Sequence, residues 1–124
     1  MNQAETVSLY VRLGRVDGIT RIVHDVMEAH LANPVVAPRF RAVKDMDHAK
    51  KMAVEFFCAG CGGPECYSGR DMLETHKGMN ISEQEYVAVM DDILGALEKN
   101  DIDPATRGDV TAILYSLKSN IVRV

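Results

Sequence analysis

The apolar residues of this chain recur at intervals of three and four positions, and this spacing predicts helices. The clearest helix starts near Asp17, whose side chain can cap it. Its apolar face is formed by Ile19, Ile22, Val23, Val26, Met27, His30 and Leu31. A shorter helix over residues 9–14 precedes it and ends at Gly14, because glycine readily adopts the backbone conformation that closes a helix.

The middle of the chain predicts two further helical segments. Asn33 and Pro34 provide a cap and a first-turn proline for a short helical turn. This turn reaches Phe40, and Pro38 limits its length. An aspartate at position 45 or 47 can begin the next helix. The stripe of that helix consists of Ala49, Met52, Ala53, Phe56, Phe57 and Gly60.

Two long helices complete the predicted pattern. Ser82 and Glu85 have the spacing of a capping box, in which the serine and the glutamate each satisfy a backbone donor. The helix that follows carries Tyr86, Met90, Ile93 and Leu97 on one side. Asp103 and Pro104 can cap and begin the last helix. Its apolar positions are Val110, Ile113, Leu114, Leu117 and Ile121.

These segments predict an all-α fold in one domain that spans residues 1–124. No segment alternates like a strand, and the sequence contains no repeat and no low-complexity tract. We expect two antiparallel helix pairs, one made by the helices that start near positions 17 and 47 and the other by the last two helices.

The composition narrows the classes of function. A net charge of -4 with scattered Lys and Arg residues leaves no basic stripe, which argues against a nucleic-acid partner. The sequence has no run of about 18 apolar residues and no signal-peptide pattern in its polar start, so we expect no membrane association and a cytoplasmic location. Seven Met residues and no Trp favour a core that adapts to an irregular guest, although ordinary variation of core composition is the simpler reading.

Residues 56–81 form an irregular segment in the middle of an otherwise helical chain. Unpaired backbone there forfeits hydrogen bonds, so we expect something other than protein to fill the adjacent space. Four short patterns stand out in and near it: Phe56-Phe57, Gly62-Gly63-Pro64, Tyr67-Ser68-Gly69, and Met72 three residues before Thr75-His76. With Phe40, these patterns resemble the group I truncated haemoglobins. The resemblance implies a truncated two-over-two globin sandwich that holds non-covalent haem b.

The resemblance makes His76 the proximal ligand of the haem iron, since neutral imidazole is the usual globin ligand. Met72 and Leu73 precede it and can pack beneath a porphyrin. The other ring nitrogen of His76 should donate to a backbone carbonyl one turn back, near Met72 or Leu73. Phe40 matches the family's phenylalanine that stacks on the haem. Two roles, lining of the haem cavity and ordinary core packing, are open for six residues: Phe56, Phe57, Tyr67, Met72, Tyr86 and Ile113.

The distal side departs from the family pattern. Group I members usually place a tyrosine or phenylalanine where this chain has Met27, and polar residues where it has Ala49, Met52 and Ala53. None of these side chains can donate a hydrogen bond. A hydrogen bond to a partly charged ligand contributes about 1.5 to 3 kcal/mol, so we expect dioxygen retention about 10- to 150-fold weaker than in a polar pocket.

The sixth iron position therefore has two readings. Either a thioether, Met52 first and Met27 second, ligates the iron and raises its reduction potential, or the pocket stays open to carbon monoxide and nitric oxide. His48 becomes a further candidate if the alignment shifts by one residue, although a solvent-facing His48 is expected. His24 falls on a polar helix face, and His30 is expected to be a satisfied core histidine.

Three cysteines lie near the irregular segment. Cys58 and Cys61 have the spacing of a thiol redox motif, but no second pair completes a zinc site and Gly62 stands where haem attachment would need histidine. We expect apolar filling by free thiols or a reversible bond between Cys61 and Cys66.

Three functions follow from these observations. The first is a globin that binds diatomic gases. The resemblance adds nitric oxide dioxygenase activity to this function, but the apolar distal residues do not support that activity. The second is a His/Met haem protein that exchanges electrons with a redox partner or senses redox state. The third is a haem-free helical interaction module. The sequence does not indicate the oligomeric state.

Overall fold

The computed structural model describes residues 7–124, in which the chain forms seven helices. The polar start at residues 1–5, on which the expectation of no signal peptide rests, lies outside the described residues. The helices are α1 (Leu9–Arg12), α2 (Arg15–Ala32), α3 (Ala37–Arg41), α4 (Met46–Gly60), α5 (Met72–His76), α6 (Glu83–Lys99) and α7 (Pro104–Ile121). Between residues 7 and 124 the sole β contact is an isolated bridge between Ile81 and Val122, so the predicted all-helical class is confirmed.

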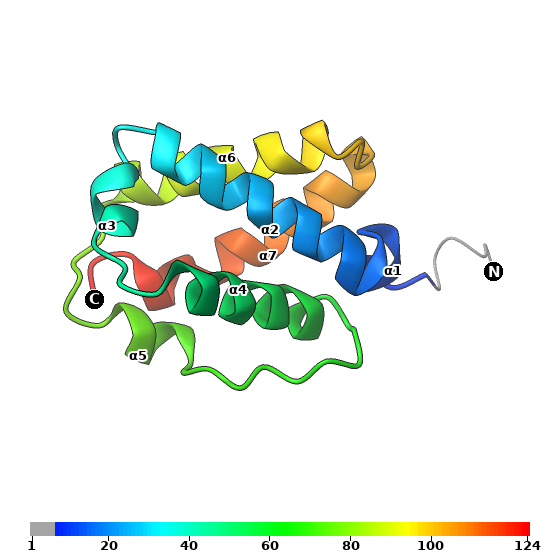
Figure 1. Ribbon diagram of the computed structural model, residues 1–124, viewed down its shortest axis with the longest axis horizontal. Coiled ribbons are helices and arrows are strands. Elements are labelled where there is room, and N and C mark those ends of the chain that lie inside the picture. The colour runs from blue at the N-terminus through cyan, green and yellow to red at the C-terminus, as the bar shows by residue number, and fades with distance from the viewer. Residues whose placement is uncertain (1–6) are drawn as a thin grey trace.

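The helices pack as two antiparallel pairs, α2 with α4 and α6 with α7, and α2 also packs against α6 (Figure 1). Helix α5 belongs to neither pair. It follows a long loop that leaves α4, and it packs against α7 (Figure 1). This is the predicted two-over-two arrangement.

Three of the predicted helix starts are confirmed by their capping geometry. Asp45 accepts a hydrogen bond from the backbone N–H of His48 at 3.0 Å. Ser82 and Glu85 satisfy each other's backbone donors, so the capping box of α6 is complete. Asp103 caps α7 by accepting from Thr106 at 3.0 Å. These local bonds fix where the three helices begin.

Two other predicted helix starts are wrong. Helix α2 begins at Arg15 after Gly14, whose φ of 94° is left-handed, and Asp17 lies in the first turn rather than at the cap. An acidic residue in the first turn still interacts favourably with the helix dipole. Pro34 does not start α3, which begins at Ala37 with Pro38 in its first turn. Pro38 thus opens the helix that it was expected to limit, because a first-turn residue needs no N–H.

The core runs along the facing sides of α2, α6 and α7. Ile19, Val23, Leu97 and Val110 are at most 2% exposed, whereas Leu31, predicted on the same stripe of α2, is 38% exposed. Leu31 therefore sits at the edge of the apolar face.

The end of the chain fixes the segment that follows α5. Gly78 N and Asn80 N both donate to the Val124 carbonyl, at 3.2 and 2.9 Å. Arg123 N donates to the Ile81 carbonyl at 2.9 Å. These backbone bonds tie α5 to the end of α7 and so help to position the residues that α5 presents.

Candidate cofactor-binding cavity

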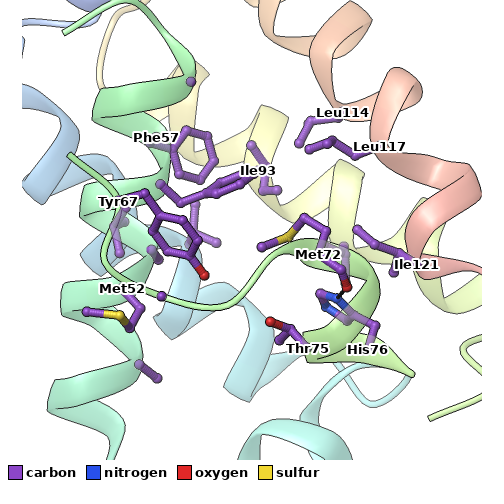
Figure 2. A pocket seen from close by; sticks show the side chains of 18 of the residues that line it. Met52, Phe57, Tyr67, Met72, Thr75, His76, Ile93, Leu114, Leu117 and Ile121 are labelled. Atoms are coloured by element: carbon purple, nitrogen blue, oxygen red, sulfur yellow. Dashed lines mark hydrogen bonds between the residues drawn. The ribbon is translucent and has the colours of Figure 1, made fainter. Parts of the chain in front are cut away.

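A cavity of about 820 Å³ lies between α2, α4, α5, α6 and α7. Its volume falls in the range of pockets that hold cofactors and drug-sized ligands, and its inner lining is mainly apolar. Figure 2 shows that side chains from α4, α5 and α7 and from the loop before α5 converge on it. The irregular segment thus borders a cavity that something other than protein can fill, as the sequence predicted.

The structure brings the residues assigned from the sequence together around this one cavity. It is lined by Met27, Phe40, His48, Ala49, Met52, Ala53, Phe56, Phe57, Tyr67, Met72, His76, Tyr86 and Ile113. The expectation for Leu73 is wrong, because this side chain is 45% exposed on the outer face of α5 and does not line the cavity. A five-residue helix can turn only one side inward, and Met72 and His76 occupy that side (Figure 2).

His76 is held in one orientation at the end of α5. Asp71 caps this short helix by accepting from the Glu74 N–H at 2.8 Å. His76 Nδ1 lies 2.8 Å from the Met72 carbonyl oxygen, which confirms the predicted acceptor one turn back. Because a carbonyl can only accept, Nδ1 carries the proton, and in a neutral ring of this tautomer the lone pair is on Nε2. No partner for Nε2 exists among residues 7–124.

The hydroxyl groups of the cavity wall are engaged elsewhere. The Tyr67 hydroxyl donates to the Arg70 carbonyl at 2.7 Å, and the Tyr86 hydroxyl donates to the Leu114 carbonyl. The Thr75 hydroxyl donates to the Asp71 carbonyl at 2.8 Å. Since each hydroxyl proton is used by the backbone, none of these groups is available to stabilise a small anion or a polar gas in the cavity.

Most of the inner wall formed by α2 and α4 is apolar. Met27 is 7% exposed, and Ala49, Met52 and Ala53 are partly covered on α4. None of these four side chains has an N–H or O–H group. Where the α4 helix meets solvent, His48 and Lys51 form part of an exposed polar rim, which Arg70 from the loop extends.

Several residues that line the cavity were not predicted from the sequence. Thr75 precedes the histidine, and Leu117 and Ile121 reach the cavity from α7 (Figure 2). The periodicity of α7 had marked Leu117 and Ile121 as core positions, but it carries no information on which helix they face. No local sequence pattern marked Lys51 or Arg70 as cavity residues either.

His30 is buried in the core, as predicted, but only its Nδ1 is paired, and the residue also lines the cavity. It is 3% exposed, and its Nδ1 lies 2.8 Å from Asp92 Oδ2 on α6. Burial lowers the pKa of His30, although the neighbouring Asp92 opposes this shift. The ring also packs against Phe40, with their centroids 4.6 Å apart.

The cysteines are free thiols, so the disulfide bond that the sequence allowed between Cys61 and Cys66 is not formed. Cys58 and Cys61 are buried at the end of α4, and burial raises the pKa of each thiol to about 11. Thiols with such pKa values are protonated and unreactive at neutral pH. The two side chains therefore act as apolar filling, whereas Cys66 is exposed.

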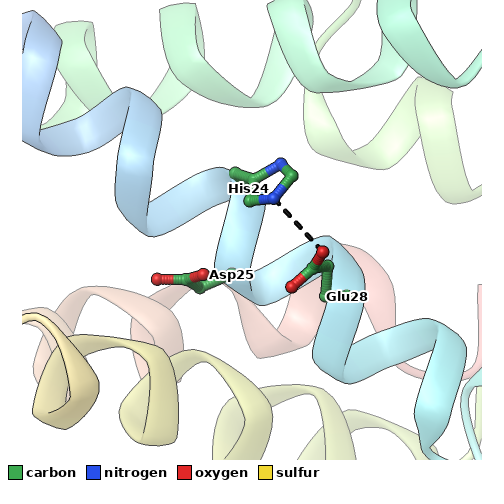
Figure 3. Close-up of side chains that lie close together, drawn as sticks. All are labelled: His24, Asp25 and Glu28. Atoms are coloured by element: carbon green, nitrogen blue, oxygen red, sulfur yellow. Dashed lines mark ion pairs between the residues drawn. The ribbon is translucent and has the colours of Figure 1, made fainter.

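A second group of possible metal ligands lies outside the cavity, on the exposed side of α2. His24, Asp25 and Glu28 come close together, and His24 Nε2 lies 3.2 Å from Glu28 (Figure 3). Asp25 instead accepts from Asn100 at 2.8 Å and from Lys99 at 3.3 Å. The cluster is explained by these ion pairs and hydrogen bonds, and His24 is exposed as predicted.

Two antiparallel helix pairs around an apolar cavity, with one oriented imidazole on a short helix, define a truncated globin architecture. The model of the bacterial-like globin family matches residues 8–123, so this chain belongs to that family.

Curated relatives agree with this result. The chain is 26% identical to the group 1 truncated hemoglobin of Tetrahymena pyriformis over 122 residues, which cover 98% of each chain. It is 27% identical to the group 1 truncated hemoglobin GlbN of Mycolicibacterium paratuberculosis over 119 residues, which cover 96% of this chain and 87% of the relative. The resemblance seen in the sequence is thereby confirmed.

Solved structures share the fold. The Fe(III) form of the Tetrahymena pyriformis protein superposes with a TM-score of 0.91 at 24% identity, covering 95% of this chain and all of that one. A Synechococcus 2/2 hemoglobin with covalently attached heme gives a TM-score of 0.81 at 22% identity, covering 90% and 94%. In the part of the chain that the structure describes, no helix is long and apolar enough to span a bilayer.

Proposed function

We propose that this globin holds haem b non-covalently in the cavity and that His76 Nε2 is the axial ligand of the iron. Membership of the globin family implies haem binding. The observation that carries the residue assignment is the His76 ring, whose Nδ1 donates to the Met72 carbonyl at 2.8 Å while Nε2 stays free at the cavity. A hydrogen-bonded Nδ1 fixes the ring and makes Nε2 a better donor to a metal.

The remaining lining fits a flat apolar group with two acidic substituents. Phe40, Phe56, Phe57 and Tyr67 supply aromatic surface, and Phe56 and Tyr67 pack edge to face with centroids 5.3 Å apart. Lys51 and Arg70 at the rim would pair with the haem propionates, since both are cations beside the opening. The buried thiols Cys58 and Cys61 favour non-covalent rather than thioether attachment, and the free cysteines suit a reducing cytoplasm.

Bound haem iron would supply a reversible binding site for diatomic gases, and the chain's own residues decide which gas is retained. Met27, Ala49, Met52 and Ala53 line the cavity but donate no hydrogen bond. Carbon monoxide and nitric oxide depend little on such donors, whereas dioxygen depends on them strongly. We therefore propose a gas-binding globin with weak retention of dioxygen. The same lack of donors argues against nitric oxide dioxygenase turnover.

A second function is favoured by one observation, the partly covered Met52 thioether in the cavity lining. If Met52 or Met27 ligates the iron, the protein would be a six-coordinate haem protein that exchanges electrons with a redox partner. A haem-free interaction module is the remaining alternative.

Haemin titration of the purified protein, followed by visible spectra, tests the proposal. We expect one haem per chain, a five-coordinate ferrous form, and a carbon monoxide complex. His76→Leu should abolish or severely weaken haem uptake, whereas the matched variant His48→Leu, altered at the exposed rim, should leave it unchanged. A low-spin spectrum with a sulfur-to-iron band that disappears in Met52→Leu would assign the His/Met function. The absence of a Soret band would assign the haem-free one.

A further inference from the structure

His30 is the second histidine with one committed and one free ring nitrogen at the cavity. A carboxylate that accepts from Nδ1 leaves the lone pair of the neutral ring on Nε2. Nε2 has no hydrogen-bond partner among residues 7–124, and it is not among the fully buried polar atoms without a partner. Since the ring is 3% exposed and lines the cavity, this atom is open to the cavity.

The His30 ring is fixed from two sides. Asp92 holds Nδ1 at 2.8 Å and is itself anchored by Asn33, whose Nδ2 donates to both carboxylate oxygens at 3.2 Å. Phe40 packs on the ring face, tilted by 32°. A ring held in this way keeps its free nitrogen in one place, and the carboxylate behind it strengthens that nitrogen as an acceptor.

His30 Nε2 is accessible from the cavity, so a molecule held there can bond to it. Leaving a polar atom without a hydrogen-bond partner in a protein interior costs about 1–3 kcal/mol of stability. The hydroxyls of Tyr67, Thr75 and Tyr86 cannot be that partner, because they donate to backbone carbonyls. Lys51 and Arg70 lie at the exposed rim, so a small molecule in the cavity that carries a proton is the partner open to His30 Nε2.

We propose that His30 Nε2 is the hydrogen-bond acceptor of the distal pocket and that it selects protic ligands, namely water and hydrogen sulfide, over dioxygen. This inference rests on the proposed function, since the ligand would be bound at the haem iron. Bound dioxygen carries partial negative charge and offers no proton, so a lone pair repels it. His30 therefore does not replace the missing donors at Met27, Ala49 and Ala53.

The first test compares a protic and an aprotic ligand on the haem-loaded protein. His30→Leu should reduce the affinity of the ferric form for hydrogen sulfide about tenfold, the effect of one hydrogen bond, and should lower the water-bound fraction in the ferric spectrum. Carbon monoxide affinity of the ferrous form should change less than about twofold. The control His24→Leu removes an exposed histidine from the same helix and should change neither affinity.

The second test keeps the shape of the buried pair. Asp92→Asn retains a hydrogen-bonding side chain but removes the carboxylate, and it should weaken hydrogen sulfide binding in the same direction by a smaller factor. Nitrogen NMR of histidine-labelled carbonmonoxy protein should show His30 protonated at Nδ1 and unprotonated at Nε2. A proton on Nε2 would overturn the proposal.

The outcomes separate this inference from the proposed function. A protein that takes up no haem contradicts the proposed function, and the inference fails with it. A His30→Leu variant that binds haem normally and keeps its affinity for hydrogen sulfide contradicts the inference alone. Equal losses for hydrogen sulfide and carbon monoxide would assign His30 a merely structural role and would also overturn it.

Discussion

The two sides of the cavity are built in different ways. The side that carries His76 is a five-residue helix with no buried residue, held by an Asp71 cap, by the Met72 carbonyl and by backbone bonds from the chain's end. The opposite side consists of the long helices α2 and α4, with Met27 deeply packed and no hydrogen-bond donor at Met27, Ala49, Met52 or Ala53. Local hydrogen bonds thus orient the proposed iron ligand. On the other side, the packing of apolar side chains determines which hydrogen bonds can be offered to a ligand in the cavity.

The largest expected effect comes from giving the apolar side a donor. Met27→Tyr places a hydroxyl on α2 at the cavity, and it should slow dioxygen dissociation from the ferrous protein about 10- to 150-fold. Met27→Phe adds a ring of similar size without the donor and should leave the rate near that of the parent. Stopped-flow measurement of dioxygen release decides the matter, and equal rates in the two variants would show that polarity at this position is irrelevant.

A smaller effect is expected from weakening the histidine side. Asp71→Ala removes the cap of α5 and should cost about 1 kcal/mol, which corresponds to roughly fivefold faster haem loss. Asp45→Ala removes the equivalent cap from α4 and provides the matched control. It should lower the free energy of unfolding with little change in haem loss. Transfer of haem to an apoglobin scavenger measures the rates, and equal acceleration by both variants would contradict the difference between the two sides.

The smallest effect concerns the ion pair that ties α3, next to Phe40, to the start of α6. Arg39 donates to both Glu85 oxygens, and this contact lowers the pKa of Glu85 from 4.5 to about 2. A pKa lowered in the folded state stabilises the fold above about pH 4.5, and that stability is lost as the pH falls towards 2. The partly exposed pair should contribute less than about 1 kcal/mol.

Urea unfolding across this pH range checks the assignment. Glu85→Gln should be less stable than the parent at neutral pH, and its stability should vary less with pH below about 4.5. Glu83→Gln, at an exposed site that pairs with Lys118 at 3.4 Å, serves as the control. A parent and a Glu85→Gln variant with parallel pH profiles would exclude the ion pair as a source of acid sensitivity.

Features encoded within a few residues were predictable from the sequence. The caps at Asp45, Ser82 and Asp103 and the bond from His76 to the Met72 carbonyl all join groups three or four positions apart, and the structure contains each of them. The start of α2 was misplaced because the left-handed conformation of Gly14 outweighed the capping preference of the aspartate that follows.

Features that join distant parts of the chain were not predictable in this way. His30 and Asp92 are 62 positions apart, and Arg39 and Glu85 are 46 apart. Helical periodicity identified His30 as an inward-facing residue, but it could not reveal which carboxylate would reach its ring. Met27 could be recognised as a difference on the distal side only because the family pattern supplies a tyrosine or phenylalanine at this position.

The iron–imidazole stretching band of the ferrous haem protein, measured by resonance Raman spectroscopy, tests the central assignment most directly. We predict that the band is present in the parent, shifts when histidine is labelled with heavy nitrogen, disappears in His76→Gly, and returns when free imidazole is added to that variant. A band that persists unchanged in His76→Gly without added imidazole would show that another residue ligates the iron.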